Sequence, residues 1–161
     1  MREFFYKKNI PLNLNPGKEC KTNPDFCYSV KKTNINMKDL KRYYNLKATP
    51  ADIYSALTNA VMLEIWTGEK AVMEPKVNTE FSLWDGSVVG INLEFEKNKK
   101  VVQQWFFGDE QTPSIVTIKL HPNKEKTSVE LSHTNIPDDA YQNISEGWDE
   151  DFFGALNELF I

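Results

Sequence analysis

The densest set of side chains suited to acid–base chemistry lies near the C-terminus, in the stretch GWDEDFFGAL that begins at Gly147. Asp149, Glu150 and Asp151 are consecutive acids, and paired carboxylates can act as the acid and base of a hydrolase. On a helix, however, consecutive side chains point in different directions and would not converge on one substrate. We therefore expect surface acids that are favoured by the dipole at the N-terminus of a helix.

The two histidines, His121 and His133, are the remaining candidates for a catalytic base. His121 precedes Pro122 and His133 precedes the segment TNIP, so both are expected at strand ends. Neither lies near a serine or cysteine in a nucleophile motif, and the sequence has no glycine-rich phosphate loop. We therefore expect the protein not to be an enzyme.

Cys20 and Cys27 are the only cysteines, and they do not form the CxxC pair typical of a zinc site. Both histidines are far away in the sequence, so we predict no metal site and no cofactor. Free thiols are expected in a reducing cytoplasm, with a disulfide across the short intervening loop as the alternative. The sequon at Asn143 is expected to be unused because the N-terminus does not resemble a secretory signal.

The net charge of -4 conceals two oppositely charged parts. Residues 1–50 carry 11 Lys and Arg against 4 Asp and Glu, whereas residues 51–161 carry 8 against 19. We expect the basic part to lie against the acidic part or to be solvated, with a contact to an acidic partner as the alternative. Only KRYY, from Lys41 to Tyr44, combines cations with stacking rings, so nucleic acid is not expected as a partner.

The chain of 161 residues is long enough for one domain with a substantial core. Proline, glycine and weak periodicity indicate an irregular leader over residues 1–36, followed by one domain over residues 37–161. No apolar run approaches the ~20 residues that a membrane span needs, so a cytoplasmic location is expected. The residues do not specify an oligomeric state.

The elements that must position these groups begin with a strand between Met37 and Lys47. In the next segment, ATPADIYSALTNAVMLEIWTG, Thr49 is suited to cap a helix. Asn59 is expected to interrupt that helix, and Gly68 to end its second part. The sequence therefore predicts a pair of short helices after the first strand.

Further along, the hydrophobic period changes from that of a helix to that of a strand. Asp85-Gly86 fits a two-residue hairpin turn, and KNKK and PNKEK are expected to form later turns. After the first turn, four apolar residues alternate with polar residues or glycine, and we expect them to face the core. These four are Val89, Ile91, Leu93 and Phe95. The pattern predicts an antiparallel sheet of five or more strands.

The acidic stretch then belongs to a last helix that we expect to be capped by Ser145. Its apolar stripe is expected to comprise Trp148, Phe152, Leu159 and either Ala155 or Leu156. The concave face of the sheet is the surface available to cover this stripe. Burying Trp148 and Phe152 there contributes about 1.5 to 3 kcal/mol each.

Together these segments resemble a known family over about Met37 to Ile161. The helix pair, the hairpin WDGSVVG, the strands VVQQWFF and SIVTIKLHPNKEKTSVELSHTNIP, and the closing GWDEDFFGALNELF are similar to the C-terminal-type domain of the activator of heat-shock protein 90 ATPase, in the START-like (SRPBCC) superfamily. The resemblance implies an α+β helix-grip fold, in which a curved antiparallel sheet wraps a long C-terminal helix. It also implies a co-chaperone-like role with a heat-shock protein 90-type chaperone as partner.

In the eukaryotic co-chaperone, this domain follows a separate N-terminal domain that binds the chaperone's middle segment and stimulates ATP hydrolysis. We expect the 36 leader residues not to replace that domain. The resemblance therefore implies a chaperone-linked binding role more directly than it implies ATPase stimulation.

A sheet wrapped around a helix can also hold a small apolar ligand between the two, which is the alternative function. Gln103 and His133 would be the polar groups of such a cavity. Plain core packing of the same side chains is the competing interpretation. The candidate lining residues are Trp66, Phe81, Phe95, Gln103, Trp105, His133, Trp148, Phe152 and Leu156.

Overall fold

The computed structural model describes residues 36–107 and 113–161. Strand β1 (Met37–Leu46) is followed by helices α1 (Pro50–Thr58) and α2 (Ala60–Thr67). The next strands are β2 (Glu80–Leu83), β3 (Val88–Glu96), β4 (Lys100–Trp105), β5 (Ser114–Asn123) and β6 (Lys126–Pro137). The last helix consists of α3 (Asp138–Gly147), the π-helical turn η1 (Trp148–Phe152) and α4 (Phe153–Glu158). Cys20 and Cys27 lie outside the described residues.

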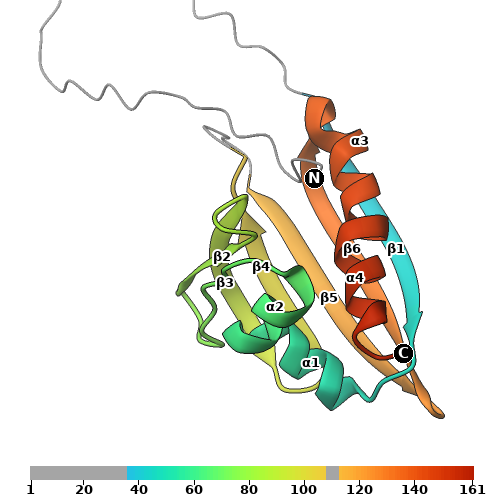
Figure 1. Ribbon diagram of the computed structural model, residues 1–161. Helices are drawn as coiled ribbons and strands as arrows, with labels where there is room; N and C mark the ends of the chain where they lie inside the picture. Colours follow the sequence, from blue (N-terminus) through green and yellow to red (C-terminus); the bar gives the residue numbers. More distant parts are fainter. Residues whose placement is uncertain (1–35, 108–112) are drawn as a thin grey trace, which may run out of the picture.

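The six strands form one antiparallel sheet in the order β1-β6-β5-β4-β3-β2. Figure 1 shows the last helix lying along β1 and β6, with α1 and α2 beside it over the neighbouring strands. The concave face of the sheet and these helices enclose the core. This arrangement confirms the predicted α+β helix-grip fold. Among the described residues, no helix is both long and apolar enough to cross a membrane.

Local sequence accounts for the helix pair. The Thr49 hydroxyl accepts a hydrogen bond from the Asp52 N–H (3.2 Å), and the Asp52 carboxylate accepts one from the Thr49 N–H (3.3 Å). This reciprocal capping box fixes the start of α1. Asn59 is extended between the helices, and its side-chain oxygen caps α2. Gly68 ends α2 in the left-handed conformation, with a φ of 73°.

The hairpin between β2 and β3 contains the predicted Asp85-Gly86 turn. Both residues have positive φ, and the Ser87 N–H donates to the Trp84 carbonyl across them (3.0 Å). Trp84 itself also has a positive φ of 48°. The strand ladder therefore ends before Trp84, and four residues, rather than two, separate β2 from β3.

The prediction that Val89, Ile91 and Leu93 face the core was wrong. The buried residues of this part of β3 are Val88, Gly90 and Asn92, whereas Val89 is 40% exposed. The ring of Phe81 occupies the space above Gly90, where an added Cβ would lie 2.7 Å from a ring carbon. Gly90 can therefore face inward beside Val88 and Asn92, because a side chain from β2 fills the space above the glycine.

A β-bulge then reverses the alternation of β3. Asn92 pairs with Gln103 and Glu94 pairs with Val102, so the residue between them is extra. As a result Phe95 pairs with the inward-facing Val101 and, of the four predicted residues, it alone shares the inner face.

The predicted start of the last helix was also wrong. The helix begins at Asp138, directly after β6, and Ser145 lies within it. Pro137 and the two acids that follow it are the helix-start signals in the sequence. The stretch containing Asp149 is therefore far from the helix N-terminus, and the helix dipole does not account for its acids.

The turn η1 widens the last helix where the aromatic residues are densest. The Phe153 N–H donates to the Asp149 carbonyl, at the regular α-helical spacing of four, and also to the Trp148 carbonyl, five residues back, which is the spacing of a π-helix. As a consequence, the consecutive residues Phe152 and Phe153 are both buried, at 4% and 2% exposure.

Candidate functional site

The interior between the last helix and the sheet is filled by aromatic rings in mutual contact. Trp148 stacks on Trp105 of β4, with ring centroids 4.8 Å apart and an interplanar angle of 27°. Its ring centroid also lies 4.5 Å from that of Phe152. Trp148, Phe152 and Leu156 are all nearly inaccessible to solvent, as the helical periodicity predicts.

A second group of rings joins the helix pair to the last helix. Trp66 of α2 packs edge-to-face against Phe152 (5.0 Å) and Trp84 (5.8 Å). Its indole N–H donates to the carbonyl of Ala56 in α1 (3.0 Å). The Trp84 ring lies 5.9 Å from that of Phe152, so the left-handed residue of the β2–β3 hairpin also packs against the last helix.

His133 is the central polar residue of this interior. It lies within β6, not at its end as predicted, and it is completely buried. The Trp148 indole N–H donates to its Nδ1 (3.0 Å), and its Nε2 lies 2.9 Å from the Ser114 hydroxyl oxygen. Burial lowers the pKa of His133 to about 3, so its ring is neutral.

This geometry fixes the tautomer of His133. Because Nδ1 accepts a hydrogen bond, the proton of the neutral ring is on Nε2 and is donated to Ser114. The Ser114 hydroxyl in turn donates to the carbonyl of Thr134 (3.1 Å). Ser114 and His133 thus have the spacing of a nucleophile and its base, but the nitrogen that faces the hydroxyl has no free lone pair. His133 holds Ser114 in place and does not activate it.

Gln103 belongs to a second internal chain of hydrogen bonds. Its Nε2 donates to the Asn92 side-chain oxygen (2.9 Å), and its Oε1 accepts from the Trp105 indole N–H (3.2 Å). Asn92 also donates to the Thr79 hydroxyl (3.1 Å) and the Glu74 carbonyl (3.2 Å), which anchors the loop before β2. In the described residues, every buried side-chain nitrogen or oxygen has a hydrogen-bond partner.

The structure thus brings together eight of the nine residues predicted to line a cavity. Phe95 is only partly buried and is not part of the buried cluster. The eight are Trp66, Phe81, Gln103, Trp105, His133, Trp148, Phe152 and Leu156. The two predicted polar groups among them, Gln103 and His133, already have protein hydrogen-bond partners.

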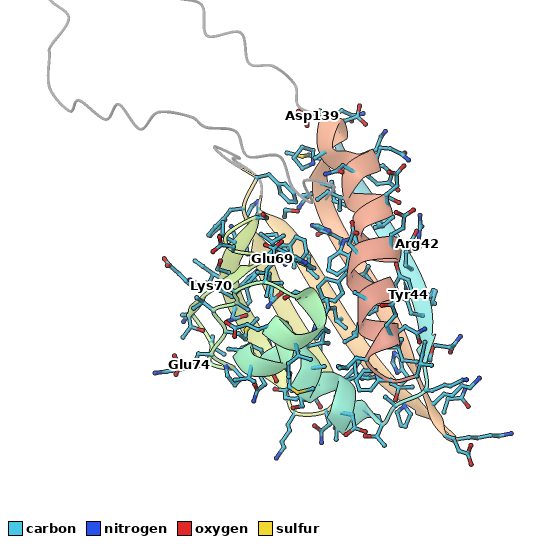
Figure 2. The ribbon with its side chains drawn as sticks, in the orientation of Figure 1. Arg42, Tyr44, Glu69, Lys70, Glu74 and Asp139 are labelled. Atoms are coloured by element: carbon cyan, nitrogen blue, oxygen red, sulfur yellow. The ribbon has the colours of Figure 1, made fainter. Side chains whose placement is uncertain are left out.

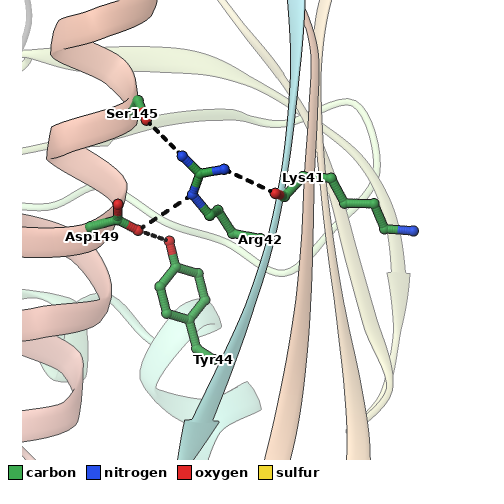
Figure 3. A network of polar contacts seen from close by, with 5 residues as sticks. All are labelled: Lys41, Arg42, Tyr44, Ser145 and Asp149. Atoms are coloured by element: carbon green, nitrogen blue, oxygen red, sulfur yellow. Dashed lines mark hydrogen bonds and ion pairs between the residues drawn. The ribbon is translucent and has the colours of Figure 1, made fainter.

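A polar network that the sequence reasoning missed joins β1 to the last helix (Figure 3). The Tyr44 hydroxyl donates to the Asp149 carboxylate (2.6 Å), and Arg42 donates to the Ser145 hydroxyl (3.1 Å). The Arg42 Nε also lies 3.9 Å from Asp149, and the Tyr44 ring stacks on Phe153 at 3.9 Å. Burial and the hydrogen bond to Asp149 raise the pKa of Tyr44.

The signal for this network was present in the alternation of β1. Leu40 and Leu46 are buried, and Arg42 and Tyr44 lie between them at intervals of two residues, which places all four side chains on the same face of the strand. The KRYY segment was interpreted only as a possible base-stacking motif. In the structure, its Arg42 and Tyr44 bind the protein's own helix.

The structure also shows a surface hollow of about 460 Å³ between the end of α2 and the β2–β3 hairpin. Figure 2 shows Glu69 and Lys70 beside α2, at the rim of this hollow. Its lining residues are Glu64, Gly68, Glu69, Lys70 and Asp85. None of the predicted cavity residues contributes to it. Within the described part of the chain, no three His, Cys, Asp or Glu side chains are placed to hold a metal ion.

Comparison with known proteins relates the chain to one family. A family model described as "Activator of Hsp90 ATPase homolog 1-like protein" matches residues 47–160. The activator of 90 kDa heat shock protein ATPase homolog of Dictyostelium discoideum is 29% identical over 126 residues, which are 76% of this chain and 33% of that protein. Homolog 2 of Mus musculus is 22% identical over 113 residues, or 69% of this chain and 34% of that protein. The chain thus spans about a third of the length of these two relatives.

Solved structures show the same fold. An HSP90 activator from Plasmodium falciparum superimposes with a TM-score of 0.71 and 26% identity, covering 77% of this chain and 96% of that chain. The Aha1 protein of Colwellia psychrerythraea, whose solution structure is of a dimer, gives a TM-score of 0.66 with 20% identity. That match also covers 77% of this chain and 96% of the other.

Proposed function

The chain belongs to the family of Activator of Hsp90 ATPase homolog 1-like proteins, and we propose that it is a non-catalytic binding domain whose partner is a heat-shock protein 90-type chaperone. The observation that carries this proposal is that the interior between the last helix and the sheet is filled by the protein's own side chains. The polar atoms of His133, Gln103 and Ser114 are bonded to the protein itself, and the rings around them are in contact. Recognition is therefore assigned to the surface of the domain.

The names of the relatives supply the class of partner. The Dictyostelium discoideum and Mus musculus relatives are named as homologs of the activator of 90 kDa heat shock protein ATPase, and the Plasmodium falciparum structure is named as an HSP90 activator. Because the chain matches only about a third of each curated relative, the proposal is binding to the chaperone. Stimulation of its ATPase, to which the names of those longer proteins refer, is not included in the proposal.

Charge supports an electrostatic component of this binding. Residues 51–161 carry 19 acids against 8 bases, which favours a basic surface on the partner and disfavours an acidic one. At about 0.15 M ionic strength the screening length is only ~8 Å, so such binding weakens as salt is added. The cytoplasmic location that the sequence predicts is compatible with a chaperone partner and stays a prediction.

The test is binding of the full chain to the heat-shock protein 90 of its own organism, with and without nucleotide, at low and high salt. The loop after α2 offers matched variants with exposed side chains, Glu69→Lys with Glu74→Lys, and Lys70→Glu with Lys76→Glu. We expect the first pair to bind more weakly than the wild type and the second pair to bind at least as tightly. Absence of binding by the wild-type chain at low salt would reject the proposal.

A second candidate function is binding of a small apolar ligand by the nine residues predicted to line a cavity. The observation in its favour is the π-helical turn beside His133, because such turns are frequent at functional sites. A ligand there has to displace rings that are now in contact, such as those of Trp105 and Trp148. A thermal-shift screen with apolar ligands tests it, because a ligand that binds only the folded form raises the melting temperature. Ligand hits that do not depend on salt, without chaperone binding, would favour this function over the first.

A further inference from the structure

The lysines of residues 51–161 are concentrated in two neighbouring hairpins at one end of the sheet. Six of the eight bases in this part of the chain lie in residues 94–100, around the β3–β4 turn, or in residues 119–130, around the β5–β6 turn. We call these six lysines the basic end. They are Lys97, Lys99, Lys100, Lys119, Lys124 and Lys126. Outside the two hairpin segments, residues 51–161 carry 2 lysines against 15 acids. The basic end is therefore a local reversal of charge on a strongly acidic body.

The backbone holds the two hairpins side by side. Figure 1 shows both turns at the lower end of the sheet, and the Leu120 N–H donates to the Lys99 carbonyl between them (2.7 Å). Lys100 of β4 lies directly opposite Lys119 of β5. Both side chains are on the outer face of the sheet, because the next residues of the two strands, Val101 and Leu120, are buried. Like charges at opposite positions of a sheet repel each other, and an acidic group bound between them would relieve this repulsion.

Most lysines of the basic end are not neutralised by the rest of the domain. Lys99 binds Glu96 (2.9 Å), and Lys100 binds Glu94 (2.6 Å). The other four lysines are exposed and form no ion pair within residues 36–107 and 113–161. These four are Lys97, Lys119, Lys124 and Lys126.

The remaining acids of the same two hairpins do not offset these four lysines. Glu130 lies opposite Lys119 but binds Lys41 (3.0 Å) and His121 (3.3 Å). Glu125 is a single carboxylate at the β5–β6 turn. The two hairpins therefore carry a surplus of exposed positive charge.

The ligand that fits this surface is a run of carboxylates on an extended chain. A lysine ammonium is a compact point charge that can pair with a single carboxylate. From Lys119 to Asn123, the last residue before the turn, β5 advances about 13 Å, which an extended segment of about five residues also spans. We propose that the basic end binds an acidic, extended segment of a partner protein. This site has the opposite charge to the acidic surface assigned to chaperone binding and is separate from it.

Two observations favour a protein segment over a nucleic acid or a membrane. Single-stranded nucleic acids bind by stacking successive bases on several rings, whereas the row of opposed residues through Lys100 and Lys119 contains one ring, that of Tyr43. That ring already has the Lys41 ammonium 5.4 Å from its centroid. A membrane surface or a long duplex would also extend beyond the two hairpins and meet the acidic body, which repels it.

The experiment measures the binding of a fluorescent peptide of about eight glutamates, which extends over ~26 Å, to the full chain by fluorescence anisotropy at low salt. The variant Lys119→Gln with Lys124→Gln removes two exposed charges from the basic end. Lys70→Gln with Lys76→Gln is the matched control, because it removes the same charge from exposed residues outside the two hairpins. We expect the first variant to bind the peptide more weakly by about 1.5- to 5-fold for each lysine removed, and the control to bind it like the wild type. Added salt should weaken the binding of the wild type.

Three results would overturn the proposal. The first is absence of peptide binding by the wild type at low salt. The second is equal binding by the wild type and both variants, which is also the result expected if the basic residues 1–35 bind the peptide. The third is tighter binding of a single-stranded oligonucleotide of equal charge, or of phosphatidylserine vesicles, with a loss in the Lys119→Gln and Lys124→Gln variant, since the basic end would then be a nucleic-acid or membrane site. The assay contains no chaperone, so its outcome is independent of the proposed function.

Discussion

Trp148→Ala is the substitution expected to damage the fold most specifically. The Trp148 ring stacks on Trp105, contacts Phe152 and donates its N–H to His133 Nδ1. Truncation of a buried tryptophan leaves a cavity and costs about 3 to 5 kcal/mol. It also leaves His133 Nδ1 buried without a donor, which adds about 1 to 3 kcal/mol unless the cavity admits water.

The two contributions separate in a second variant. Trp148→Phe keeps an aromatic ring at the position and removes the N–H donor, so we expect a loss of about 1 to 3 kcal/mol from the unpaired Nδ1, together with a smaller loss of packing. Asp149→Asn is the matched control on the same turn. Its side chain is partly exposed and asparagine retains an oxygen for the Tyr44 hydroxyl, so the loss should stay within about 1 kcal/mol.

The measurement is the free energy of unfolding from denaturant titration, with an unchanged dependence on denaturant as the check that all variants unfold in the same way. We expect the losses to rank Trp148→Ala, then Trp148→Phe, then Asp149→Asn. Equal losses for Trp148→Ala and Asp149→Asn would refute the assignment of Trp148 as the anchor between helix and sheet.

Three further predictions concern pH, backbone space and the domain boundary. The folded-state pKa of His133 is lowered to about 3, from about 6.5 in the unfolded chain, so the unfolded state binds more protons below pH 6.5. The free energy of unfolding should therefore fall by up to about 1.4 kcal/mol per pH unit as the pH decreases from 6.5 toward 3. The variant His133→Gln should lose this pH dependence in denaturant titrations at several pH values. Gly90→Ala should destabilise the protein by about 3 kcal/mol or more, since its Cβ would clash with the Gln104 backbone carbonyl oxygen and lie 2.7 Å from the Phe81 ring. Gly68→Ala, with open space and only a positive φ to accommodate, should cost about 1 kcal/mol; equal melting temperatures for the two would contradict this. Limited proteolysis before Thr33 should leave a cooperatively melting domain, and loss of cooperativity would place part of the leader within the fold.

The features that were predictable from the sequence depend on neighbouring residues. Thr49, Asn59 and Gly68 are separate signals that each act within one helical turn, and all three mark helix ends in the structure. The burial of Trp148 and Phe152 likewise follows from a spacing of four residues on a helix. Such signals are independent of what packs against the element.

The features that were missed depend on partners distant in the sequence. The inner face of β3 is set by the Phe81 ring above Gly90 and by a bulge that no local residue announces. The burial of His133 depends on a donor, Trp148, from the last helix. An isolated strand pattern therefore assigned Val89, Ile91 and Leu93 to the core, although the residues buried in that part of β3 are Val88, Gly90 and Asn92.

The π-helical turn has a consequence for how the two halves of the domain are connected. Phe152 packs on Trp66 of the helix pair, and Phe153, the next residue, packs on Tyr44 of β1. A regular helix turns by about 100° per residue, so consecutive side chains point in different directions. In this wider turn both directions lead into the interior, because Phe152 and Phe153 are both buried. Because the π-helical turn accommodates one extra residue within a single turn, deleting Glu150 would restore the regular α-helical spacing and leave α4, including Leu156, close to its present orientation, so the damage would be confined to the packing of Phe152 and Phe153. A deletion within the regular helix α4 would instead rotate the residues that follow it by about 100°, so this turn is the place in the last helix where the loss of one residue should disturb the contacts of Leu156 least.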